Sequence, residues 1–201
     1  MQNRHTYTKT KNMLMCGLFA AVTGVAACMI LPLPFTPVPG SLATLAVMVA
    51  GGVLGSRLGA MSMAVYVLIG AFGVPVFGGF TGGLGRLAGP TGGFLLGYVL
   101  MAFVVGFVVE RWSPRAQAAS ASASPGSWGR PRLHELIVYG TAMAVGTGAC
   151  YGMGTGWFMA VTGSGLWASL VACVFPFVVG DLIKILAAAW LVQRLRKHIR
   201  I

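Results

Sequence analysis

Residues 175–191 read FPFVVGDLIKILAAAWL and form the centre of an apolar run over 166–192 that contains only two charges, Asp181 and Lys184. About 20 apolar residues in a helix cross the hydrocarbon core of a bilayer. An ionised residue near the middle of such a helix costs on the order of 2.5–3.5 kcal/mol on insertion scales. Two charges in one apolar helix therefore predict a membrane span in which the pair has a use.

The whole composition agrees with a membrane protein. Of the 201 residues, 57% are hydrophobic and only 8% are charged, whereas a soluble domain carries about a quarter of its residues as charges. We therefore expect an all-α protein of the cell (cytoplasmic or inner) membrane, multi-pass, with residues 1–201 as a single transmembrane domain.

Further apolar runs surround the first one. Two long helices or three shorter ones fit residues 136–192; we favour two, which give six transmembrane helices in all. The connecting segments differ in character: a polar N-terminal segment, a proline-rich stretch, a glycine-rich outer loop, a low-complexity linker and a basic tail (1–12, 32–41, 75–93, 112–132 and 193–201). The linker is expected to be flexible.

The basic residues indicate the orientation. With six spans and a cytoplasmic N-terminus, twelve of the fourteen Lys and Arg residues fall in cytoplasmic segments, as the positive-inside rule requires. Both termini are thus expected to be cytoplasmic, and the net charge of +11 does not call for a nucleic-acid partner. The two exceptions are Arg86 and Lys184.

These exceptions are candidate site residues. Asp181 and Lys184 are three residues apart and share a helix face. A carboxylate only accepts hydrogen bonds and an ammonium only donates them, so the pair suits a ligand with N–H donors and an oxygen acceptor. A buried structural pair, or Lys184 extending toward the interface, remains open. Arg86 either pairs with a ligand carboxylate or contacts lipid headgroups.

Other chemistries have no support in the sequence. The four cysteines lie singly in apolar stretches, so neither a metal nor a redox site is expected. No catalytic set is visible, since all three histidines fall in polar segments. The glycine-rich loop lacks the spacing of a phosphate-binding loop. We expect no enzyme and no cofactor.

Small residues recur on one side of the first span. Such a stripe lets another helix approach closely, and it serves either a partner protein or packing within the chain. The residues are Cys16, Ala20, Gly24 and Cys28, with Gly17 and Ala21 beside them.

Four motifs together resemble the BioY family, the biotin-specific substrate-binding (S) subunits of energy-coupling-factor (ECF) transporters. They are LPLPFTPVPGSLATLAV (31–47), LGSRLGAMSMAVYVLIGAFGVPVF (54–77), GGLGRLAGPTGGFLLGY (82–98) and FPFVVGDLIK (175–184). The resemblance implies a six-helix ECF S-component that binds biotin near the outer face. It also implies docking, through Gly17, Ala20, Ala21 and Gly24, onto a transmembrane coupling protein with two cytoplasmic ATPases.

The same resemblance assigns the site. Asp181 is expected to accept a hydrogen bond from a ureido N–H and Lys184 to donate to a ligand oxygen. Arg86 is expected at the entrance, with Tyr98 and Phe80 in an apolar-aromatic wall. Two departures bear on specificity, because relatives often carry Gln where this chain has Ala43 and Asn near Gly79. The alternatives are an S subunit for another vitamin, a stand-alone ion-driven carrier, and a membrane scaffold without a ligand.

Overall fold

Helices make up most of the structure, a computed structural model that describes residues 2–31, 40–113 and 133–196. The helices are α1 (Gln2–Cys28), α2 (Ala43–Leu54), α3 (Ser56–Ala71), α4 (Leu84–Ala88), α5 (Gly92–Trp112), α7 (Leu133–Thr162), α8 (Leu166–Cys173) and α9 (Phe175–Leu195). Strands β1 (Ile30–Leu31) and β2 (Gly40–Ser41) pair antiparallel, Ile30 with Ser41 and Leu31 with Gly40.

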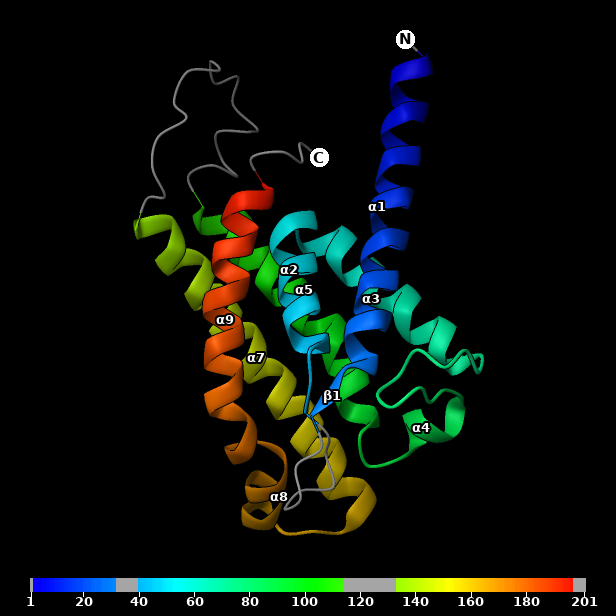
Figure 1. Ribbon diagram of the computed structural model, residues 1–201, viewed down its shortest axis with the longest axis vertical. Coiled ribbons are helices and arrows are strands. Elements are labelled where there is room, and N and C mark those ends of the chain that lie inside the picture. The colour runs from blue at the N-terminus through cyan, green and yellow to red at the C-terminus, as the bar shows by residue number, and fades with distance from the viewer. Residues whose placement is uncertain (1, 32–39, 114–132, 197–201) are drawn as a thin grey trace.

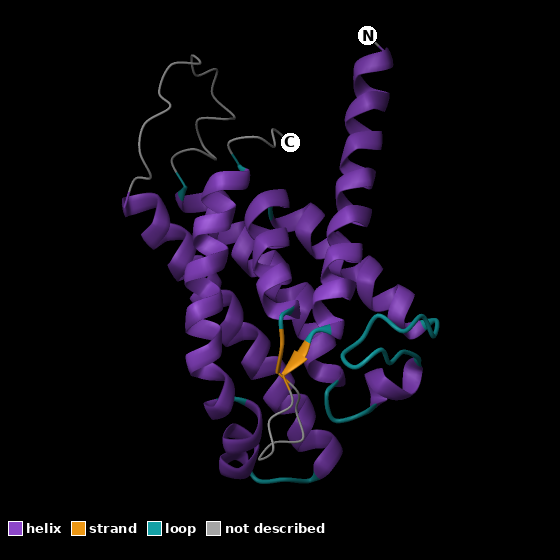
Figure 2. Ribbon diagram, in the orientation of Figure 1, coloured by secondary structure: helices purple, strands orange, loops and turns teal. Residues whose placement is uncertain are grey.

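The longer helices run back and forth between the two ends of a bundle. The start of α1, the end of α5 and the end of α9 lie at one end, which we call the terminal end (Figure 1). Strands β1 and β2, helix α4 and helix α8 lie toward the other, the hairpin end, where most of the loops also gather (Figure 2). Four helices of the described chain are long and apolar enough to cross a membrane, namely α1, α5, α7 and α9.

Helix α2 is short and lies inside the bundle. Its 12 residues span only about 18 Å at 1.5 Å per residue, less than the roughly 30 Å of a hydrocarbon core. Most of its side chains are buried in the main apolar core with α5, α7 and α9. It begins just after β2, at Ala43, and this leaves the space toward the hairpin end open for a cavity.

A tight turn joins α2 to α3 and packs against α5. Gly55 has a φ of 85°, a conformation that favours glycine. Glu110 on α5 accepts hydrogen bonds from the Ser56 backbone N–H at 2.8 Å and the Ser56 hydroxyl at 2.7 Å, so it caps the start of α3. Gly106 lies so close that a Cβ there would meet the Ser56 nitrogen at 2.3 Å.

The structure differs from the expected elements in two places. The sequence favours one helix over 166–192 and also allows three helices over 136–192; the structure has three, because the run divides at Val174 into α8 and α9. Pro176 in the first turn of α9 explains the break, because proline has no backbone N–H to continue a helix and restricts the residue before it. The glycine-rich segment 75–93 also contains the short helix α4.

Several predictions fall outside the described residues. They are the proline-rich stretch 32–39, nearly all of the linker (114–132), and the end of the basic tail (197–201). The boundaries of a single domain over 1–201 likewise stay a prediction.

Candidate ligand-binding site

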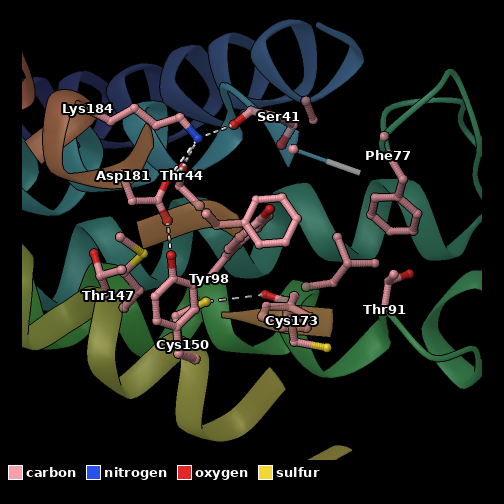
Figure 3. A pocket seen from close by; sticks show the side chains of 18 of the residues that line it. Ser41, Thr44, Phe77, Thr91, Tyr98, Thr147, Cys150, Cys173, Asp181 and Lys184 are labelled. Carbon is pink, nitrogen blue, oxygen red and sulfur yellow. Dashed lines mark hydrogen bonds and ion pairs between the residues drawn. The ribbon is translucent and has the colours of Figure 1, made fainter. Parts of the chain in front are cut away.

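A cavity lies toward the hairpin end, and each helix of the described chain, α1 to α5 and α7 to α9, contributes to its wall. The lining is mostly apolar and aromatic, with polar groups at few points. Within the described chain its charged residues are Arg86, Asp181 and Lys184. Figure 3 shows Asp181 and Lys184 at one end of the cavity and Phe77 and Thr91 at the other. The three charges predicted from the sequence therefore line one site.

Asp181 and Lys184 form an ion pair across one turn of α9. Lys184 Nζ lies 2.9 Å from Asp181 Oδ1. It also donates to the Ser41 carbonyl at 2.8 Å and to the Thr44 hydroxyl at 3.2 Å. An ammonium has three N–H donors, so protein acceptors take all three. Lys184 therefore donates to a ligand oxygen only if it gives up one of these bonds.

Asp181 retains capacity to accept. Its side chain is buried, with the residue 4% exposed. The Thr44 hydroxyl donates to Oδ1 at 3.4 Å, and the Tyr151 hydroxyl makes a short bond to Oδ2. Together with Lys184 these donors occupy three of about four acceptor positions on a carboxylate. One position on Oδ2 is left to receive an N–H from a ligand.

Arg86 belongs to the opposite side of the site. It extends from α4, and its guanidinium donates to the Thr81 hydroxyl at 2.9 Å and to the Gly78 carbonyl at 3.2 Å. Since a guanidinium has five N–H donors, three are left for a ligand. Arg86 is thus the lining cation best able to bind an anionic group.

The aromatic wall differs in part from the prediction. Tyr98 lines the cavity as predicted, with its ring 6.5 Å from that of Tyr66. Phe80 does not line it and is 72% exposed. Phe77 occupies the wall instead, 2% exposed and packed edge-on against Tyr66 at 5.7 Å. Backbone geometry explains the exchange, because the turn at Gly79 and Phe80, both with positive φ, directs Phe80 outward.

The small residues of α1 separate into two groups. Ala20 and Gly24 are buried, and a Cβ on Gly24 would touch Val76 at 3.4 Å. Nearby, Ser62 on α3 donates to the Cys16 carbonyl at 2.7 Å. Ala20 and Gly24 therefore pack within the chain, while Gly17 and Ala21 are exposed. A docking role for this stripe stays a prediction.

Several lining residues were not predicted. Thr44, Thr147 and Tyr151 are uncharged polar residues within apolar helices, and that placement was the signal that would have found them. Neither Ala43 nor Gly79 lines the cavity. In the described residues no three His, Cys, Asp or Glu side chains are grouped to hold a metal, and all four cysteines are free thiols.

Comparisons with known proteins agree over nearly the whole chain. The profile of the BioY family matches residues 1–201. A biotin transporter BioY of Rhizobium etli is 35% identical over 185 residues, 90% of this chain and 91% of that protein. One of Thermotoga maritima is 33% identical over 187 residues, 93% of this chain and 96% of that protein.

A solved structure also matches. It is the crystal structure of the S-component for biotin from an ECF-type ABC transporter, with a TM-score of 0.77 at 26% identity. The match covers 96% of this chain and 94% of that one. The similarity thus extends over the helices that form the cavity.

Proposed function

The chain belongs to the BioY family, and on that premise we propose that it captures biotin in the cavity between Asp181 and Arg86 for uptake into the cell. Membership makes it a multi-pass membrane protein of a transporter family and not an enzyme. The observation that supports the ligand most strongly is the unfilled acceptor position on buried Asp181, in a cavity that otherwise has aromatic walls.

The charges suggest how biotin is oriented. Its ureido ring carries N–H donors, and its valerate chain ends in a carboxylate. The ring would lie at Asp181, where an acceptor is open, and the tail at Arg86, where three donors are open. The reverse orientation would place a carboxylate against Asp181, and two like charges at close range repel each other. Tyr66, Phe77 and Tyr98 would enclose the apolar part between them.

Lys184 would act chiefly on Asp181. Its ion pair holds the carboxylate in place, and its bonds to the Ser41 carbonyl and the Thr44 hydroxyl join α9 to β2 and α2. A direct bond to the ureido oxygen would form by exchange of the longest of these contacts, the one to Thr44.

Uptake would require partners that bring energy. We propose that the chain is the S subunit of an ATP-driven ECF-type transporter and docks onto a transmembrane coupling protein with two cytoplasmic ATPases. On α1, the exposed residues Gly17 and Ala21 offer the surface for that contact, since small residues allow close approach of helices.

The proposed topology has six spans with both termini in the cytoplasm. In the described chain α1, α2, α3, α5, α7 and α9 alternate in direction between the two ends of the bundle (Figure 1). Arg57, Arg111 and Arg194 lie near the terminal end of these helices, consistent with a cytoplasmic terminal end. The cavity would then open toward the outside.

The test is binding of labelled biotin to the purified protein in detergent, with competition by unlabelled vitamins. We expect saturable binding displaced by biotin alone. Displacement by another vitamin and not by biotin would identify a different S subunit. Biotin uptake that is abolished by an ionophore but persists in the absence of the ATPases would indicate an ion-driven carrier.

A further inference from the structure

A second cavity adjoins the first on its Arg86 side. Arg86 and Thr91 line both cavities. The rest of the outer lining comes from the segment around α4 and from the end of α7, namely Gly85, Gly89, Pro90, Phe158 and Thr162. Arg86 and Thr91 therefore lie between the two cavities.

We propose that the outer cavity is a subsite for a group attached to the carboxyl end of the ligand. The protein then binds carboxyl-amidated derivatives of biotin as well as free biotin. This inference rests on the proposed function, because it takes biotin as the ligand of the inner cavity and extends the range of substrates at the same site.

The orientation of the ligand leads to this subsite. Asp181 and Lys184 lie at the end of the inner cavity away from Thr91 (Figure 3). A ring held at Asp181 directs its tail toward Arg86 and Thr91. These two residues also line the outer cavity, so a group attached to the carboxyl carbon would extend toward that space.

The outer lining suits a neutral extension. Arg86 is its one charged residue within the described chain, and two glycines form part of its wall. The Thr162 hydroxyl already donates to the Phe158 carbonyl at 2.7 Å. An amide keeps the carbonyl oxygen of the original carboxylate, so Arg86 still has an acceptor, although the bond loses the assistance of a full negative charge.

Gly85 offers a way to fill the outer cavity alone. It lines that cavity and not the inner one, and a Cβ built on it meets nothing within 4 Å. A leucine at this position therefore adds bulk beside the outer cavity without displacing backbone. Gly156 on α7 is the matched control, because it is equally open and lines neither cavity.

The experiment is calorimetric titration of the purified protein in detergent with two ligands: free biotin, and a conjugate of biotin joined by an amide to the uncharged chain of butylamine. We expect the conjugate to bind within about tenfold of biotin, the loss of one charge-assisted bond. Gly85→Leu should weaken the conjugate by more than about tenfold and leave free biotin unchanged. Gly156→Leu should change neither.

Three results would overturn the inference. In the first, the wild type binds free biotin but binds the conjugate about 100-fold more weakly or not at all. In the second, Gly85→Leu weakens the binding of both ligands equally. In the third, Gly85→Leu weakens the binding of neither ligand. Failure to bind free biotin in a folded sample is different, because it refutes the proposed function and this inference with it.

Discussion

Tyr151 on α7 donates a short hydrogen bond to Oδ2 of Asp181 on α9, 30 residues further along the chain. The bond joins two helices at the polar end of the cavity. It orients the Asp181 carboxylate, which we propose accepts a hydrogen bond from the ligand. Neither residue could be paired with the other from the sequence, since nothing in the spacing says which turn of α7 faces Asp181.

Removal of the Tyr151 hydroxyl should weaken biotin binding without unfolding the protein. Tyr151→Phe keeps the ring and deletes one bond to a charged acceptor, which contributes roughly 1.5–3 kcal/mol. We expect a loss of about tenfold or more in affinity by calorimetry. Tyr139→Phe is the control, because Tyr139 is a buried tyrosine of the same helix that does not line the cavity. An equal loss in both variants would contradict a specific role for Tyr151.

Lys184 should matter for stability as well as for binding. Lys184→Met leaves a buried carboxylate without its counter-charge, and breaking such a pair costs about 3 kcal/mol. We expect a clear fall in the melting temperature in detergent. The double variant Asp181→Asn/Lys184→Met removes both charges and should recover most of that stability without recovering biotin binding. A double variant as unstable as the single one would show that the pair is not the source of the loss.

Arg86 should favour a ligand whose tail ends in a negatively charged carboxylate over one whose tail is neutral. Arg86→Gln removes the charge that pairs with a carboxylate, so free biotin should bind about tenfold more weakly or worse. The neutral primary amide of biotin should lose much less. The affinities of the two ligands for the wild type and the variant form a thermodynamic cycle, which isolates the interaction between Arg86 and the carboxylate. Equal losses for acid and amide would place the carboxylate elsewhere.

Close packing of α5 against the α2–α3 turn gives a prediction on stability alone. A Cβ at Gly106 would lie 2.3 Å from the Ser56 nitrogen and 2.4 Å from the Gly55 carbonyl carbon. Backbone must move to admit it, and overpacking of this kind costs typically about 1–3 kcal/mol. Gly106→Ala should therefore melt at a lower temperature. Gly140→Ala, where nothing lies within 4 Å, should be neutral or stabilising; a similar drop in both would refute the packing argument.

The sequence was informative wherever a residue violated the rules of a membrane span. Asp181, Lys184 and Arg86 attracted attention because charges are costly there, and the structure places all three around one cavity. Uncharged polar residues carry a weaker signal, because a threonine in an apolar helix bonds readily to its own backbone; Thr23 does so with the Phe19 carbonyl. Thr44 was missed for this reason.

Loop side chains were harder still to predict. Phe77 and Phe80 are three residues apart in a glycine-rich segment, and only the backbone conformation decides which one turns inward. The break between α8 and α9, by contrast, could have been predicted from Pro176.

The most direct test of the account is the affinity for biotin of wild type and Asp181→Asn, measured by calorimetry on monodisperse protein in detergent. Glu110→Gln serves as the control, because that carboxylate lies outside the cavity. We predict saturable binding by the wild type and by Glu110→Gln, and a loss of about 100-fold in Asp181→Asn, since hydrogen bonds to an ionised group contribute roughly 1.5–3 kcal/mol each. The stabilised Asp181→Asn/Lys184→Met variant should also fail to bind. Unchanged affinity in a folded Asp181→Asn protein would contradict the assignment of Asp181 as the ligand's acceptor.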